Sequence, residues 1–172
     1  MRSLILIAHN LRSCHNIGSL LRTAEGLGIT EVVLSGYTPY PLLANPGYDD
    51  RLPHLAQKIH KQIKKTALGA ETSQAWRHEP NIETVLEQLH ADGYTLAAVE
   101  QSPQSIKLPD YQPPEKLALL LGREVEGVEP EILAKMDTAL EIPMFGQKES
   151  FNVVQAAAMA LYHCRFHPTV RQ

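Results

Sequence analysis

Short apolar runs alternate with amphipathic segments along the first third of the chain. The runs at 4–8 and 31–34 predict two buried strands. Between them, apolar residues recur at helical spacing and predict a helix that Asn16 is suited to cap and that ends near Gly28. Strands separated by helices are typical of βα units. The pattern therefore predicts an α/β fold, with a mostly parallel sheet flanked by helices.

The same alternation continues through the middle of the chain. Helices are expected at 53–66 and 82–89, and buried strands at 95–99 and 117–121, with a proline-rich connection between those two strands. The segment 35–50 carries three prolines, two glycines and three tyrosines. This composition predicts an irregular loop, long enough to cover a site.

The segment 141–162 combines a short apolar strand, a glycine-containing loop and an alanine-rich helix. Its Pro143, Gly146, Ser150 and Asn152 bring turn-forming and hydrogen-bonding residues to the carboxyl end of a strand. Open α/β sheets bind their ligands at that edge. We therefore expect chemistry here.

Composition and charge set limits on the class of protein. With 172 residues, 44% of them hydrophobic and 20% charged, we expect one domain spanning 1–172. The first apolar run is too short for a signal peptide and no later stretch approaches membrane-spanning length, so we expect a cytoplasmic protein with no membrane partner. Cys14 and Cys164 are then reduced thiols. The net charge of −3 argues against a broadly basic nucleic-acid surface.

A first group of polar residues lies in the predicted helix after the first strand. Arg22 follows Asn16 by six residues, which places the two side chains about 120° apart around a helix. Arg22 therefore leaves the apolar face that Leu20 and Leu27 share. Taken by spacing alone, this favours an ordinary helix cap and a surface arginine.

A second group follows the strand at 117–121. Gly122 is followed by Arg123, Glu124, Glu126 and Gly127. A phosphate-binding loop is excluded, because a lysine and a hydroxyl residue are missing after Gly127 and the acids would repel phosphate. Gly122 permits another backbone or a flat ligand to approach closely, and Glu124 can accept hydrogen bonds. A tight turn with solvated acids is the alternative interpretation.

Together, the three segments resemble the three sequence motifs of the SpoU/TrmH family of SPOUT RNA methyltransferases, in their expected order. The matching residues are Asn16, Gly18, Arg22, Thr23, Ala24 and Gly28 for the first motif, Gly122, Glu124 and Gly127 for the second, and Ile142, Pro143, Met144, Gly146, Ser150 and Asn152 for the third. Two departures affect the expected pocket shape. Phe151 replaces the more usual leucine, and Val154 and Gln155 stand where small or hydroxyl residues are common.

The resemblance implies a fold, a cofactor and a reaction. The fold is a SPOUT domain with a trefoil knot in the region 117–166, and the reaction is methyl transfer from S-adenosylmethionine to a ribose 2′-hydroxyl of RNA. The implied cofactor-binding residues are Val99, Leu121, Gly122, Ile142, Met144, Ser150 and Phe151. The implied catalytic residues are Arg22, at the reacting hydroxyl, and Asn16, Glu124, Ser150 and Asn152, which orient it and the substrate.

The resemblance also implies partners. Minimal members of the family are homodimers, so Arg22 of one chain would meet the cofactor of the other. For RNA contact, Arg22 is joined by Lys58, Lys61 and Lys65, which share one face of the predicted helix 53–66. A solvated helix face is the simpler explanation of such a lysine run. Among RNAs, tRNA is favoured over rRNA, because a compact dimer suits a small folded substrate.

Two further readings complete the sequence predictions. His163 and His167 have the spacing of a metal-binding pair, but no third ligand is evident nearby, and we expect no metal. The alternative function is a non-catalytic RNA-binding or assembly protein that keeps the cofactor fold. Arg22, Glu124, Ser150 and Asn152 occurring together favour the enzyme, since a scaffold has no chemical need for them.

Overall fold

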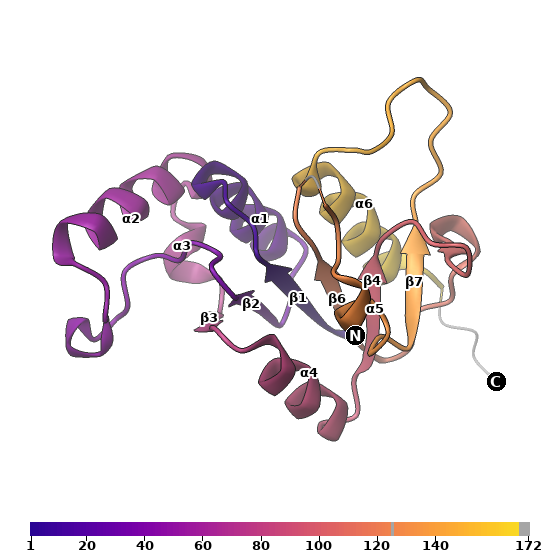
Figure 1. The fold of residues 1–172 in the computed structure, drawn as a ribbon, viewed down its shortest axis with the longest axis horizontal. Coiled ribbons are helices and arrows are strands. Elements are labelled where there is room, and N and C mark those ends of the chain that lie inside the picture. The colour runs from indigo at the N-terminus through magenta and orange to yellow at the C-terminus, as the bar shows by residue number, and fades with distance from the viewer. Residues whose placement is uncertain (125, 169–172) are drawn as a thin grey trace.

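The computed structural model describes residues 1–124 and 126–168, and in this part of the chain seven strands form one parallel sheet (Figure 1). The strand order is β3-β2-β1-β6-β4-β7-β5. The strands are β1 (Ser3–His9), β2 (Glu31–Ser35), β3 (Trp76–Glu79), β4 (Thr95–Val99), β5 (Ile106–Lys107), β6 (Lys116–Leu121) and β7 (Thr138–Glu141). The helices are α1 (Cys14–Gly26), α2 (Pro53–Ala67), α3 (Ala70–Ser73), α4 (Ile82–Ala91), α5 (Pro130–Leu133) and α6 (Val153–Phe166), with single 3₁₀ turns at Pro46–Tyr48 and Leu108–Asp110.

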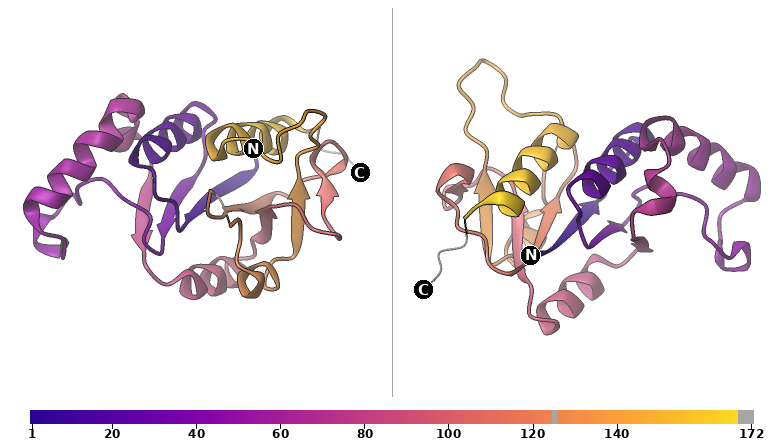
Figure 2. Two further views of the ribbon diagram at one scale, coloured as in Figure 1. Left: turned by 45° about the horizontal axis from the view of Figure 1, so that its top comes forward. Right: turned by 180° about the vertical axis from the view of Figure 1, so that it is seen from behind.

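Both faces of the sheet are buried. On one face Leu4 and Leu6 of β1 belong to a core that includes residues of α1 and α6. On the other face Ile5 and Ile7 pack in a second core with residues of α4 and α5. The two helix layers lie on opposite sides of the sheet in Figure 2. Burial on both faces explains why the central strands read as continuous apolar runs.

Helix α2 packs on α1 rather than on the sheet. A Cβ added at Gly18 of α1 would lie 2.1 Å from the carbonyl oxygen of Ile63 in α2, so only glycine permits this approach. Thr66 of α2 also donates a hydrogen bond to the backbone oxygen of His15. The opposite face of α2 is left exposed beside α1.

The structure confirms most of the predicted elements and corrects two details. Strand 95–99 is observed as predicted, and the other predicted strands and helices of the first 121 residues are found within a few residues of their expected ends. Asn16 does not cap α1; Ser13 does, and its Oγ accepts a hydrogen bond from the Asn16 N–H at 3.2 Å. The strand expected to begin segment 141–162 ends at Glu141 instead. Pro143 has no N–H to donate to a strand ladder, which explains why 142–152 is a loop.

Strand β6 lies at the centre of the sheet, between β1 and β4, although it follows both in the chain. Its carboxyl end therefore lies between the carboxyl ends of β1 and β4, with β7 next along the sheet. The sheet and its helix layers confirm the predicted α/β class. The single domain over 1–172 and the knot over 117–166 stay predictions. Among the described residues, no helix combines the length and the apolarity needed to cross a bilayer.

Candidate active site

A pocket opens at the carboxyl ends of β4, β6 and β7. Residues of the loop 142–152, which rises above β7 in Figure 1, and of the first turn of α6 form part of its lining. The lining residues are Val99, Glu100, Gln101, Leu121, Gly122, Arg123, Glu124, Glu126, Gly127, Leu140, Ile142, Met144, Glu149, Ser150, Phe151, Val153 and Ala156. All seven residues predicted to bind a cofactor are in this set. The structure therefore brings together segments that are up to 52 positions apart in the chain (99 to 151).

The floor of the pocket is a close contact between two backbones. A Cβ at Gly122 would lie 2.5 Å from the carbonyl carbon of Gly127 and 2.6 Å from the N of Val128. The Arg123 and Gly127 backbones also exchange two hydrogen bonds, of 3.0 and 3.1 Å. The close backbone approach expected at Gly122 is thus present, and the turn after β6 is folded back onto the end of its own strand.

Sequence reasoning missed Glu100, which connects this turn to the end of β4. Its Oε2 accepts a hydrogen bond of 2.9 Å from the Val128 N–H, and its Oε1 accepts one from the Gln101 N–H. Gly127 has φ of +72°, and a Cβ there would lie 2.3 Å from Glu100 Oε2. Glu100 follows a strand directly, at the edge where ligands bind, and that position was the available signal.

The pocket lining is rich in carboxylates. Glu100, Glu124, Glu126 and Glu149 line it, with Arg123 as the basic residue among the lining residues given above. Leu121, Ile142, Met144 and Phe151 provide apolar surface in the same pocket. Such a lining favours a ligand that combines an apolar or flat part with positive charge, and disfavours a polyphosphate.

The predicted catalytic residues divide between the pocket and its surroundings. Glu124 and Ser150 line the pocket. Asn16 at the start of α1 donates a hydrogen bond of 3.4 Å to Glu124 Oε1, so the first and second motifs meet across 108 positions. Asn152 caps α6 by accepting a hydrogen bond from the Val154 N–H. Arg22 is exposed on α1 and lies outside the described lining of the pocket.

The residues predicted to contact RNA lie on two neighbouring helices. Lys58, Lys61 and Lys65 are all exposed on α2, and Arg22 is exposed on α1. Of the two histidines with the spacing of a metal-binding pair, for which no metal is expected, His163 has its Nε2 2.8 Å from the backbone oxygen of Tyr111.

A polar network that the sequence did not predict lies behind the pocket, at the carboxyl end of β1. Asn10 has φ of +56° and is its central residue. Its Oδ1 accepts a hydrogen bond from the Tyr37 N–H, which fixes the amide so that Nδ2 donates to His9 Nε2 at 3.0 Å and to Glu129 Oε1 at 3.0 Å. His9 Nε2 is therefore an acceptor, and Nδ1 donates to Ser35 Oγ at 2.9 Å. His9 is buried as a neutral imidazole.

Glu129 connects this network to the second motif. Arg123 Nη2 lies 2.6 Å from Glu129 Oε1. Burial acts to raise the pKa of Glu129, but the hydrogen bonds from the backbone and from Asn10, together with the charge of Arg123, outweigh it and lower that pKa. Glu129 is therefore held as a carboxylate between the end of β1 and the turn after β6.

The neutral His9 predicts a pH dependence of stability. Burial lowers the pKa of His9 below 6.5, with a smaller lowering by Arg123 and an opposing effect of Glu129. Below about pH 6.5 the unfolded chain binds a proton that the folded chain does not, so the free energy of unfolding falls as the pH drops through this range and is fully recovered above it. His78, whose pKa is also lowered by burial, acts in the same direction.

Thermal unfolding followed by circular dichroism at pH 7.5 and pH 5.5 measures this effect. We expect a lower melting temperature at pH 5.5, and a smaller difference between the two pH values in a His9→Gln variant. Substituting the exposed His15 by Gln is the matched control and should leave the difference unchanged. A His9→Gln protein with the full wild-type pH dependence would contradict the prediction.

The fold and the pocket define an α/β protein with a ligand site at the carboxyl edge of a parallel sheet. A family model described as the SpoU rRNA Methylase family matches residues 51–162. The chain belongs to this family.

Two curated relatives carry related names, and one solved structure shares the fold. A tRNA (guanosine(18)-2′-O)-methyltransferase of Mus musculus is 30% identical over 92% of this chain and 9% of the relative. A 23S rRNA (guanosine(2553)-2′-O)-methyltransferase of Bacillus subtilis is 28% identical over 94% of this chain and 57% of the relative. The crystal structure of an AdoMet-bound rRNA methyltransferase from Sinorhizobium meliloti has a TM-score of 0.79 at 20% identity, over 96% of this chain and 56% of that one. This likeness shows the fold.

The chain spans less than two thirds of the length of these relatives. The alignments cover 92–94% of this chain.

Proposed function

We propose that this protein transfers a methyl group from S-adenosylmethionine to a ribose 2′-hydroxyl of RNA. The observation that carries the proposal is the pocket at the ends of β4, β6 and β7, which unites all seven residues that the family resemblance assigned to the cofactor. Membership in the SpoU family and the methyltransferase names of its relatives support the same reaction.

The residues of the pocket fit this cofactor. S-adenosylmethionine carries its methyl group on a positively charged sulfur, and would supply that group to the ribose oxygen. Glu100, Glu124 and Glu149 place negative charge around the pocket, which favours a cation. Gly122 and the turn after it contribute backbone to the lining of the pocket, and backbone polar groups there would bind a flat base.

The chain's own residues then act on the RNA. A ribose hydroxyl is a weak nucleophile, and its oxygen gains negative charge as its proton leaves. Arginine side chains keep their proton in proteins, so Arg22 serves better as a binding group than as a base. In this mechanism Arg22 positions the phosphate next to the target ribose and stabilises the charge on the oxygen, while the phosphate shares in proton removal. Asn16, held by Glu124, lies at the amino end of the same helix.

The position of Arg22 supports a homodimer in which two subunits share each site. Arg22 is exposed and lies outside the described lining of the pocket, so a second chain could bring its own Arg22 to that pocket. One face of α6 also exposes Tyr162 and Phe166, which are 61% and 59% accessible. Exposed aromatic residues on one helix face are typical of an interface between subunits. The exposed Lys58, Lys61 and Lys65 would contribute to the RNA surface.

The proposed substrate is tRNA. The relatives named above include one tRNA and one rRNA enzyme. A dimer of this small domain suits tRNA, because the folded substrate is itself small.

Transfer of tritium-labelled methyl groups from S-adenosylmethionine to unmodified tRNA and rRNA tests the function directly. We expect incorporation into tRNA, and after nuclease digestion the label should lie on 2′-O-methylated nucleotides. Label on a base would show that the protein methylates a base and would contradict the proposed transfer to ribose. Cofactor binding without incorporation into either RNA would favour the alternative, a non-catalytic RNA-binding or assembly protein.

A further inference from the structure

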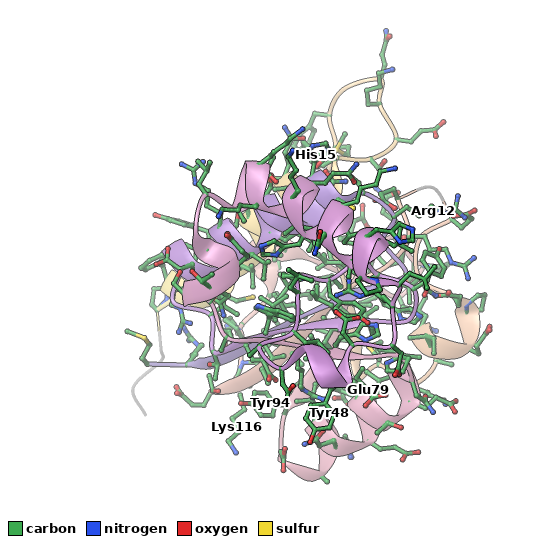
Figure 3. All side chains as sticks on the ribbon, turned by 90° about the vertical axis from the view of Figure 1, so that its left-hand side faces the viewer. Arg12, His15, Tyr48, Glu79, Tyr94 and Lys116 are labelled. Carbon is green, nitrogen blue, oxygen red and sulfur yellow. The ribbon has the colours of Figure 1, made fainter. Side chains whose placement is uncertain are left out.

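An exposed tyrosine lies beside an exposed arginine near the carboxyl ends of β1 and β2. The Arg12 Cζ is 5.9 Å from the centroid of the Tyr37 ring. Half of Tyr37 is accessible, and Arg12 is exposed at the periphery of the molecule in Figure 3. Neither residue belongs to the three motifs, and neither is among the residues that line the pocket.

The backbone around Tyr37 is held on both sides. The Tyr37 N–H donates a hydrogen bond of 3.2 Å to Asn10 Oδ1. The next residue, Thr38, is buried; its Oγ1 donates to the Ala8 carbonyl at 3.0 Å and accepts from the Leu11 N–H at 3.1 Å. The Tyr37 backbone is therefore fixed to the end of β1, while half of the residue stays accessible to solvent.

The residue before Tyr37 shows how tightly this loop fits. Gly36 has φ of +66°, and a Cβ there would lie 1.9 Å from Asn10 Oδ1. Asn10 also donates to Glu129, so the same side chain holds both the Tyr37 backbone and the turn that follows β6. Because the backbone that carries it is held in place, the exposed aromatic ring loses little conformational entropy when a ligand covers it.

Contacts on two sides connect this pair to the pocket. Asn10, which accepts from the Tyr37 N–H, donates to Glu129, and Glu129 Oε1 lies 2.6 Å from Nη2 of Arg123, a residue that lines the pocket. Asn16, a few positions after Arg12 in the chain, donates to Glu124, which also lines the pocket. Tyr37 and Arg12 therefore lie beside the turn after β6 that forms one side of the site.

We propose that Tyr37 and Arg12 form an RNA contact at the rim of this pocket, in which the Tyr37 ring stacks on an unpaired base and Arg12 binds a neighbouring phosphate. Aromatic side chains stack on bases of any sequence, and arginine binds phosphate in a fixed geometry. RNA is favoured over a protein partner because the pair adjoins a site proposed to act on ribose. The inference rests on the proposed function and adds to it an unpaired nucleotide near the target.

Three variants test the contact, and binding of unmodified tRNA transcripts is measured with S-adenosylhomocysteine present. Tyr37→Ala should weaken RNA binding by about 5- to 150-fold, the range for loss of one stacked base. Tyr37→Phe should retain most of the affinity, since the ring remains. Arg12→Gln should weaken binding and reduce the slope of log affinity against log salt by about one unit. In turnover assays Tyr37→Ala and Arg12→Gln should act on the KM for RNA more than on kcat, and Tyr37→Phe should stay near the wild type.

The control is Tyr48→Ala, which removes an exposed tyrosine that lies away from Arg12 in Figure 3. It should leave RNA binding unchanged. Wild-type affinity and salt dependence in both Tyr37→Ala and Arg12→Gln would overturn the proposal. It would also be overturned if these variants lost binding to a protein partner while they kept RNA binding. If Tyr37→Ala also lowers the melting temperature, Arg12→Gln decides, because its side chain is exposed. Methylation by the wild-type protein is scored separately, so failure of the contact and failure of the enzyme function give different results.

Discussion

Replacing Arg22 by alanine is expected to remove nearly all methyl transfer to RNA while cofactor affinity stays near the wild-type value. Removal of one group that stabilises charge in a transition state typically lowers kcat by about 10²- to 10³-fold. Arg22 is exposed on α1 and lies outside the described lining of the pocket, so the binding surface for the cofactor remains complete. Transfer of labelled methyl groups and calorimetric binding of S-adenosylmethionine measure the two effects separately.

Two further variants sharpen this test. Arg22→Lys keeps the charge but loses the planar fork that binds phosphate through two hydrogen bonds, so it should recover only part of the activity. Arg77→Ala is the control. Arg77 of β3 forms an ion pair with Glu31 of β2 and has no role in the proposed reaction. Normal turnover in Arg22→Ala on the RNA that the wild-type protein methylates would remove Arg22 from the mechanism.

The sequence predicted the elements whose pattern is local. The apolar runs of β1, β4 and β6 follow directly from burial on both faces of a parallel sheet. The helix that begins after Asn152 was placed correctly because a capping residue precedes an alanine-rich run. β3 and β5 were missed, since one is short and partly polar and the other has two residues.

The candidate site was predictable to the extent that its residues lie in recognisable motifs. The family resemblance supplied seven residues predicted to bind the cofactor, and the structure places all seven in the lining of one pocket. It did not supply Glu100, which closes the turn after β6, or the pairing of Asn10 with Glu129 across 119 positions. Such contacts depend on where strands meet in the sheet, and no local pattern of polar residues encodes that. The same reason explains why Tyr37 and Arg12 escaped notice: each is an ordinary loop residue until the fold places them together.

Replacing Gly122 by alanine should have the second large effect, a loss of cofactor binding. The added Cβ would meet the Gly127 carbonyl and the Val128 nitrogen at 2.6 Å, and both are backbone atoms that no side-chain rotation can move. The turn carrying Glu124 must therefore shift, and the cofactor surface that it forms shifts with it. A misplacement of about 1 Å typically also costs about 100-fold in rate. Calorimetry measures the affinity for S-adenosylmethionine. Gly26→Ala is the matched control, because open space surrounds its Cβ position, and unchanged affinity in Gly122→Ala would contradict the prediction.

The two inactive variants together decide whether the site is shared between subunits. If Arg22 of one chain serves the pocket of the other, a mixed dimer of Arg22→Ala and Gly122→Ala holds one complete site, formed by the intact pocket of the first chain and the intact arginine of the second. Random exchange makes half of the dimers mixed, so about a quarter of the wild-type activity should return after equal amounts are unfolded and refolded together. If each chain uses its own Arg22, every site contains one of the two defects and no activity returns. Recovery therefore requires the arginine to cross the interface.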